Sequence, residues 1–490
     1  MCCNCCSVRQ QKIWVFIVGS FLLAAGIVLV TAWPSISRAF INSMLPLTPT
    51  SYTFGKWEVT PIPIHLNFYL FNWTNSHEVN NPNVKPHFDE LGPYAFREVR
   101  VKEDLAWNSH NNTVTYFGRR TWYFDPELSN GSLDDLITSP HLLSAAASKT
   151  SRLFPKVARK IVNFSLKREG GELTITQSAI DWIFKGFYDD YFDFVERLHS
   201  PLLPVYSNKF AWFYDRNDSK EAEGTFTIHT GKTDLPHMGD LKLWNGSDHT
   251  GNYEGECGRV NGSTGELWSP GNSWHNSISI FITDAGRFIN LFPQRNVSYR
   301  GVDSWLYTST NQTFDNGYIA ADTNCFCVKN HECPKNGVVD YSPLAPLVPA
   351  FLSHPHFYMT DPMYLENVTG LSPDPEKHRI DILMEPTLGI PLKINGQIQL
   401  SVFVEQDDLI DIFRHVAYNF YAPLVVVQIK ADINDELLNF VKFVLSVSHI
   451  GQYAGIGLII VGLITIVVGI WLTKTHNWRG DSIDKNKDAQ

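Results

Sequence analysis

The sequence predicts an α+β protein held in a membrane by two helices, one near each end of the chain. Two uncharged apolar runs, residues 13–33 and 450–472, carry this prediction. At 1.5 Å rise per residue, each run makes a helix of roughly 30–35 Å, enough to cross the hydrocarbon core of a bilayer. Between them, alternating apolar side chains typical of strands flank one helical segment at residues 133–199. Strands with an inserted helical cluster define the α+β class.

The charges beside the two runs predict which side of the membrane each part occupies. Residues 1–12 carry two basic residues and 473–490 carry four. Short basic flanks mark cytoplasmic ends, so we expect both tails in the cytoplasm and residues 34–449 outside the cell. A cleaved signal peptide is the alternative for the first run, but its apolar core would be unusually long. The last tail lacks an acidic dileucine or tyrosine-based sorting signal, which favours the plasma membrane and leaves an endosomal or phagosomal pool open.

The composition of residues 34–449 agrees with an extracellular location. This segment carries 34 basic and 47 acidic residues, and its net charge of −13 disfavours nonspecific binding to nucleic acid or anionic membranes. Anionic ligands therefore require a local basic patch. Ten Asn-x-Ser/Thr sequons also fall here, and glycans on them would keep a large surface soluble. The sequon residues are Asn72, Asn111, Asn130, Asn163, Asn217, Asn245, Asn261, Asn296, Asn311 and Asn367.

The segments between the two runs are assigned in chain order. Residues 35–45 are expected to form a short helix leaving the membrane. Strand patterns begin at Trp57, the helical segment includes a second helix near residues 178–198, and strands return after residue 205. A helix at 436–449 is expected to lead into the second run. The clearest strand patterns are PIPIHLNFYLFNW, YAFREVRV, TVTYFGRRTWYF, GTFTIHTG, LKLWNG, SISIFITD, HRIDILMEP and IQLSVFVEQ.

Four cysteines in the middle segment are expected to form two disulfides. Cys257, Cys325, Cys327 and Cys333 allow three pairings in an oxidising compartment. Cys325 and Cys327 point to opposite faces of an extended chain, which disfavours a bond between them. We favour Cys257–Cys325 with Cys327–Cys333. A metal site on Cys-x-Cys-x5-Cys is the alternative.

Four further cysteines, Cys2, Cys3, Cys5 and Cys6, precede the first run. Cysteines beside a membrane on its cytoplasmic face are common substrates for palmitoylation. A zinc cluster is the alternative, but two adjacent cysteine pairs give cramped tetrahedral geometry. Inert thiols are the third possibility.

Motifs of catalysis and of cofactor binding are missing from the sequence. It contains no Gly-x-Ser-x-Gly, no His-Glu-x-x-His and no P-loop. The pair His354 and His356 resembles a metal site only superficially, and a turn is the expected structure. We therefore expect a protein that is not an enzyme, with no cofactor and no bound metal.

A series of motifs, in a fixed order, resembles the class B scavenger receptors. Each motif alone is weak, but their order is specific and covers nearly the whole chain; the MCCNCC start most resembles an insect phagocyte receptor of this family. The motifs are PIPIHLNFYLFNWTN at 61–75, LGPYAFRE at 91–98, RRTWYFDPELSNGSLDD at 119–135, FTIHTG at 226–231, LKLWNG at 241–246, CFC at 325–327, PHFYMTDP at 355–362 and GLSPDPEKHRIDILMEPTLGIPL at 370–392.

The resemblance implies a specific architecture and a class of ligands. The ectodomain would be an antiparallel β-barrel-like core traversed by an apolar tunnel, with a helical bundle at its membrane-distal apex. The apex would bind modified lipoproteins, the anionic lipid of dying cells or microbial surfaces. The tunnel would carry fatty acids, sterols or carotenoids, with no cofactor and no covalent catalysis.

The candidate ligand site is a basic helix at residues 151–168, the densest basic stretch of the acidic segment. Phosphate and carboxylate groups need cationic donors, and the resemblance places this helix at the apex. The simpler alternative is a solvated helix face, and a glycan at Asn163 could shield the patch. The candidate residues are Lys156, Arg159, Lys160, Lys167 and Arg168, while Leu153, Val157, Ile161 and Phe164 are expected to supply apolar packing.

Two further patterns have a structural and a functional interpretation. The strand aromatics Phe68, Tyr69, Phe71 and Trp73 could line a tunnel, but ordinary core is favoured because alternation sends only half of them inward. Gly451 and Gly455 form a small-xxx-small pair, which suggests a homo-oligomer joined through the second run.

We therefore expect a cell-surface scavenger receptor that binds lipids, lipoproteins, apoptotic cells or microbes and takes up lipid. The alternatives are a dedicated lipid or carotenoid transporter or sensory co-receptor of the same family and, more remotely, a membrane-anchored ectoenzyme.

Overall fold

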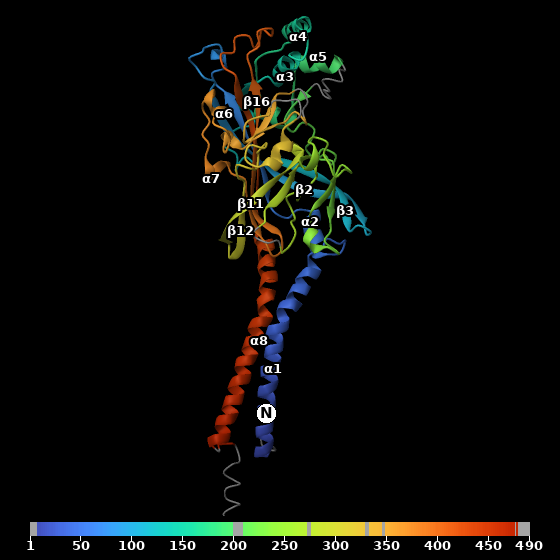
Figure 1. The fold of residues 1–490 in the computed structure, drawn as a ribbon, viewed down its shortest axis with the longest axis vertical. Helices are drawn as coiled ribbons and strands as arrows, with labels where there is room; N and C mark the ends of the chain where they lie inside the picture. The colour runs from blue at the N-terminus through green and yellow to red at the C-terminus, as the bar shows by residue number, and fades with distance from the viewer. Residues whose placement is uncertain are drawn as a thin grey trace, which may run out of the picture. The chain divides into compact units, whose positions relative to one another are not determined.

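The computed structural model describes residues 7–198, 209–271, 276–328, 333–344, 348–475 and 477–478. The chain divides into two compact units, one made by the terminal helices and the other by residues 46–434 (Figure 1). The second unit is called the ectodomain below.

The terminal unit is a pair of long apolar helices, α1 (Val8–Met44) and α8 (Asp435–Thr475). Both are long and apolar enough to cross a membrane by length and composition. Each extends beyond its predicted apolar run, so the segments expected at 35–45 and 436–449 continue these helices.

Glycines let the two terminal helices approach closely. A Cβ at Gly26 would lie 2.7 Å from the carbonyl oxygen of Gly455, and a Cβ at Gly451 would overlap the ring of Trp33. Gly451 and Gly455, expected to join two copies, therefore face α1 of their own chain. This contact occupies, within one chain, the surface that we had assigned to a homo-oligomer.

The ectodomain is built on a 13-stranded antiparallel sheet. Its main path runs β10-β11-β12-β15-β16-β17-β1-β2-β3-β8-β9, with β14 attached to β16 and β13 attached to β14. Its strands are β1 (Ile64–Trp73), β2 (Phe88–Asn108), β3 (Thr113–Phe124), β8 (Thr225–His229), β9 (Leu241–Trp244), β10 (Ile278–Ile282), β11 (Arg287–Tyr299), β12 (Val302–Thr308), β13 (Val338–Asp340), β14 (Ala350–Ser353), β15 (Asp381–Glu385), β16 (Ile390–Val404) and β17 (Phe420–Asp432).

The sheet curls until its two edges nearly meet, which confirms the α+β class with a barrel-like core. Ser263 forms isolated bridges with Asp240 on one edge and with Ile280 on the other. Alternation along each strand then sends every second side chain inward. In β17, for example, Val425, Val427 and Ile429 point to the interior cavity described below.

The helical cluster lies at one end of the ectodomain, opposite α2 (Tyr52–Glu58) and the β11–β12 hairpin (Figure 1). It contains α3 (Leu142–Ser151), α4 (Lys156–Arg168) and α5 (Asp190–Leu198), with two small sheets, β4 (Leu136–Pro140) with β5 (Thr174–Ser178) and β6 (Phe187–Tyr188) with β7 (Lys209–Phe210). Two short helices, α6 (Met363–Glu366) and α7 (Pro375–His378), complete the ectodomain.

The helix expected near residues 178–198 is wrong in its first half. After one turn at Asp181–Lys185, Gly186 adopts a φ of 73° and the chain enters β6. A left-handed residue at this point breaks helical geometry, and only Asp190–Leu198 forms a helix.

Candidate functional site

The basic helix α4 is docked on the loop after β16 by ion pairs, one of them to a buried carboxylate. Arg159 donates from Nη2 to both carboxylate oxygens of Asp407, at 2.5 and 2.6 Å. Arg152, just before the helix, lies 2.7 Å from Glu405. Asp407 is buried, so the guanidinium of Arg159 anchors the helix from its inner side. Gly170, with a φ of 76°, follows the last turn and ends the helix.

The remaining predicted cations of α4 are exposed, but they differ in their partners. Lys167 pairs with Asp411, and Arg168 lies 3.2 Å from Glu169. Lys156 and Lys160 have no acidic partner among the residues that the structure describes. These two ammonium groups are therefore the cations of α4 most available to an anionic ligand.

The apolar side chains of this helix lie where we did not expect them. The helix expected at 151–168 begins only at Lys156, and Leu153 lies in the turn before it. Leu153 is 77% exposed, Val157 74%, Ile161 65% and Phe164 63%, so our expectation that they pack in the interior is wrong. The buried side chain of α4 is Leu166. The physical reason is that the salt bridge of Arg159 and the packing of Leu166 select the opposite face for burial.

An apolar cavity of about 250 Å³ lies inside the barrel. Its lining includes aliphatic side chains from β10, β11, β14, β15, β16 and β17, together with Arg100, Arg120 and Arg216. The aliphatic lining includes Ile280, Ile282, Ile289, Leu352, Ile382, Ile394, Ile398, Leu400, Val425, Val427 and Ile429. The cavity therefore combines an apolar surface with guanidinium groups, a combination suited to an amphiphilic guest.

A second hollow of about 910 Å³ lies between α3 and strands β14, β16 and β17. Its lining includes Lys149, Phe351, Phe403 and Tyr421. It shares no lining residue with the interior cavity, and a continuous tunnel stays a prediction.

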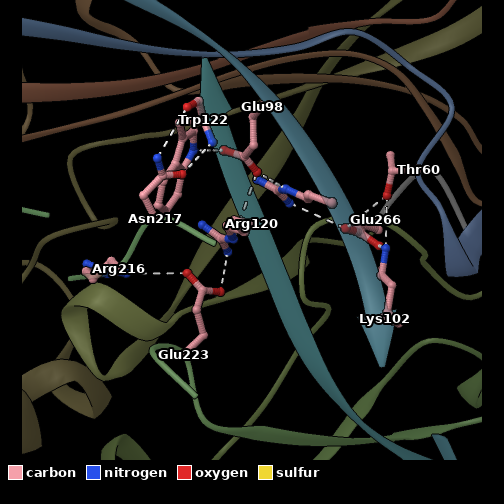
Figure 2. Close-up of polar contacts among 10 residues, drawn as sticks. Thr60, Glu98, Lys102, Arg120, Trp122, Arg216, Asn217, Glu223 and Glu266 are labelled. Carbon is pink, nitrogen blue, oxygen red and sulfur yellow. Dashed lines mark hydrogen bonds and ion pairs between the residues drawn. The ribbon is translucent and has the colours of Figure 1, made fainter. Parts of the chain in front are cut away.

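Beside the cavity, charged side chains from β2 and β3 form a buried ionic cluster (Figure 2). Nη2 of Arg120 lies 2.6 Å from Glu223, and Nη1 of Arg216 lies 2.8 Å from Asp284. Glu98 accepts hydrogen bonds from Arg100 and, at 2.8 Å, from Nε1 of Trp122. The cluster continues through Glu266, which pairs with both Arg100 and Lys102.

The environment of this cluster divides its carboxylates into two kinds. Burial acts to raise the pKa of Glu98, but the attraction of Arg100 and Arg120 outweighs it and the pKa is lowered. Burial wins at Glu223, whose pKa is raised despite the nearby Arg120. Burial likewise lowers the pKa of the Lys102 ammonium, against the attraction of Glu266. Paired buried charges of this kind are costly to leave unpaired, so the cluster is a fixed feature of the wall.

Our sequence reasoning missed this cluster, although half of its signal is visible in the sequence. Glu98, Arg100 and Lys102 alternate along β2 in phase with the core residue Phe96, which places charges on an inward face. Their partners Glu223 and Glu266 come from distant loops and cannot be found from the pattern.

Of the strand aromatics considered for a tunnel, Phe68, Phe71 and Trp73 are core residues, whereas Tyr69 is half-buried. Phe68 packs edge-on against Phe213 at 5.0 Å, and Phe71 packs against His356 at 5.5 Å. Trp73 stacks on Phe88. None of them lines the interior cavity described here.

The cysteines of the ectodomain are joined as Cys257–Cys325 and Cys327–Cys333, with Cα–Cα separations of 5.7 and 5.3 Å. Cys2, Cys3, Cys5 and Cys6 lie outside the described residues, and their acylation stays a prediction. Within the described residues, no group of three His, Cys, Asp or Glu side chains could hold a metal ion.

The ten sequons differ in their exposure. Asn72, Asn163 and Asn367 are half-buried, whereas the other seven are exposed. Asn163 donates from Nδ2 to Asp411 at 3.1 Å and accepts from the backbone N–H of Asp411 at 2.8 Å. Its amide is therefore turned toward the docking loop, and occupancy of the sequons stays a prediction.

Comparison with known proteins places this architecture in a family. Residues 17–473 match the model of the CD36 family. The chain is 32% identical to Protein peste of Drosophila melanogaster, over 90% of this chain and 79% of that protein. It is 29% identical to Scavenger receptor class B member 1 of Rattus norvegicus, over 81% of this chain and 76% of the relative. Sensory neuron membrane protein 1 of Helicoverpa armigera is 26% identical, over 84% of this chain and 80% of that protein.

A barrel-cored protein with two terminal helices long and apolar enough to span a membrane is thus the class that the fold defines, and the chain belongs to the CD36 family. This confirms the resemblance drawn from the sequence motifs. Membership and the two apolar terminal helices support a two-span membrane receptor with a scavenger or lipid-binding role.

Proposed function

We propose that this protein is a cell-surface scavenger receptor that binds anionic lipid on dying cells, lipoproteins or microbes through α4. The observation that carries the proposal is the pair of exposed, unpaired ammonium groups of Lys156 and Lys160. They stand out because residues 34–449 carry a net charge of −13. An anionic surface is attracted to such a local patch and repelled elsewhere.

Topology supports the same proposal. With both tails cytoplasmic, residues 34–449 would face the outside of the cell. The ectodomain begins and ends at residues 46 and 434, and α2 follows shortly after residue 46. Figure 1 shows α4 at the end of the ectodomain opposite α2. Within the ectodomain, α4 thus lies at the end away from the point where the chain enters it, which suits contact with a particle outside the cell.

Lipid uptake through the ectodomain is the second part of the proposal. The interior cavity is lined by aliphatic side chains and edged by three arginines, which suits a lipid with an acidic head. The same observation favours the alternative of a dedicated lipid transporter or sensory co-receptor, in which α4 would not select anionic surfaces.

Charge reversal at Lys156 and Lys160 tests the binding proposal. In intact cells displaying the full chain, we expect K156E/K160E to lower the affinity for phosphatidylserine vesicles roughly thirtyfold or more, at about 1 kcal/mol per lysine near an anionic surface. Vesicle counts per cell at 0.15 M salt would measure it. The remaining binding should be less sensitive to salt.

The matched control is K85E/K232E, which changes the same charge at two other exposed lysines. The amount of each variant at the cell surface is measured in unpermeabilised cells as the fraction of chain that external glycosidase and protease can reach, and binding is divided by this amount. Equal binding by the parent and K156E/K160E would contradict the proposed site. A chain resistant to external protease in intact cells would contradict the topology.

A further inference from the structure

The outer side of α4 carries two adjacent strips of opposite character. At roughly 100° per residue, Val157, Ile161 and Phe164 fall in one apolar strip, and Lys156, Lys160 and Lys167 fall in a basic strip beside it. Leu153, in the turn before α4, is exposed as well. The side that docks on the ectodomain carries Arg159, Val162 and Leu166.

The apolar strip is unusual for a soluble surface. Three large side chains, each between 63% and 74% exposed, follow one another along α4, and in the turn before the helix Leu153 is 77% and Phe154 37% exposed. Scattered exposed apolar residues need no explanation, but a contiguous row marks a surface that contacts something. Because Arg159 fixes the helix on Asp407, this row is held outward.

We propose that α4 inserts this apolar strip into the acyl region of an anionic lipid surface while its lysines bind the headgroups. The inference rests on the proposed function and goes beyond it, because charge attraction alone would hold the lipid only at its surface. A helix with an apolar strip beside lysines lies in a lipid interface with its apolar face buried by about 5–10 Å.

Charge complementarity and position select a lipid surface as the occupant. The unpaired Lys156 and Lys160 flank the strip, so a partner must be apolar and anionic at adjacent positions, as a headgroup layer over acyl chains is. Figure 1 shows α4 at the extreme end of the ectodomain, where a flat surface can reach it. The amide of Asn163 is turned toward Asp411, away from the apolar strip.

Salt separates the two contributions, because screening weakens the lysines and leaves apolar insertion unchanged. The experiment uses the full chain in phosphatidylcholine nanodiscs and vesicles of phosphatidylserine and phosphatidylcholine. We expect the parent and K156E/K160E to retain binding at 1 M salt. We expect V157S/I161S to lose that residual binding by roughly tenfold or more, as expected for two lost aliphatic anchors. The matched control is V59S/I319S, which removes a valine and an isoleucine exposed elsewhere.

An environment-sensitive dye at F164C provides a second measurement that does not depend on binding strength. If the strip inserts, the emission maximum of the dye should shift to the blue when vesicles are added. If V157S/I161S binds like the parent at every salt concentration, or if the dye shows no shift on bound vesicles, insertion is refuted while the role of the lysines stands. If K156E/K160E also binds like the parent, the proposed function fails as well. Vesicle-independent self-association of the parent that V157S/I161S abolishes would assign the strip to a second copy.

Discussion

At the scale of single residues, the buried carboxylate of Glu98 holds the ionic cluster together. It compensates Arg100 and Arg120 beside the cavity and accepts the indole N–H of Trp122. We expect Glu98→Gln to cost about 3–5 kcal/mol of unfolding free energy, because the buried cluster loses one negative charge and leaves, among the described residues, only Glu266 beside Arg100 and Glu223 beside Arg120.

The matched control for this change is Glu103→Gln on the same strand. Glu103 pairs with Arg119 at 2.9 Å, but both side chains are about one-third exposed, so its loss should cost at most about 1 kcal/mol. Urea unfolding of the detergent-solubilised full chain measures both. Similar costs for the two variants would mean that the buried cluster tolerates a missing charge.

The sequence predicted the residue types of the basic helix but not their orientation. The spacing of Leu153, Val157 and Ile161 predicts an amphipathic helix, which normally buries its apolar side. Here Arg159 and Leu166 decide which side is buried, through partners in a loop some 250 residues away along the chain. Such long-range contacts leave no local signal. The same limit hid Glu223 and Glu266 as partners of Arg120 and Lys102.

At the scale of elements, the terminal helix pair depends on glycines at its contact. A Cβ at Gly26 would lie within 2.7–2.8 Å of atoms of Gly455 and Ile459. We therefore expect Gly26→Leu to separate the helices and cost about 1–3 kcal/mol or more through overpacking. Thermal unfolding of the full chain in detergent would show the lower transition temperature.

Gly457→Leu is the control for the glycine contact, because a Cβ there meets nothing within 4 Å. Gly457 lies on α8, in the same apolar run as Gly455, and its replacement should leave the transition temperature unchanged. If both variants behave alike, close contact between α1 and α8 does not stabilise the protein.

Elements set by composition or by alternation were predicted well, including the strands that became β1 and β3, but the pairing of distant segments was not. The apolar runs identified α1 and α8 because a membrane span needs only length and hydropathy. The segment 178–198 was misjudged because Phe187–Tyr188 pairs with Lys209–Phe210, a contact formed across a turn that periodicity does not reveal. Closure of the barrel through Ser263 also depends on distant strands.

At the scale of the whole molecule, buried histidines make stability depend on pH. His354 is buried, and neither ring nitrogen has a hydrogen-bond partner among the described residues. Burial, and then the proximity of His378, lowers the pKa of His354 to about 3. Burial, and then His356 stacked on it at 4.4 Å, lowers the pKa of His378 to about 4. Both imidazoles therefore stay neutral in the folded state at mildly acidic pH.

The sign of the effect follows from proton binding. Above about pH 6.5 these histidines are neutral in the folded and the unfolded chain, so they contribute nothing to stability. As the pH falls below about 6.5, the unfolded chain binds protons that the folded chain refuses, and the free energy of unfolding falls until the pH reaches the folded pKa values. We expect the transition temperature of the full chain to drop between pH 6.5 and 4, the range of an endosome.

His354→Phe isolates this contribution from the other titrating groups. The ring fits an aromatic site, since His354 already packs edge-on against Phe314 at 4.8 Å. The variant should lose less stability between pH 6.5 and 4 than the parent does, whereas His110→Phe, at an exposed position, should follow the parent. Carboxylates titrate in the parent and in the variants alike, so their contribution cancels when the stabilities are subtracted at each pH. This includes Glu90, which lies 3.1 Å from His356. If His354→Phe and the parent lose the same stability over this range, His354 does not contribute to the acid sensitivity of the protein.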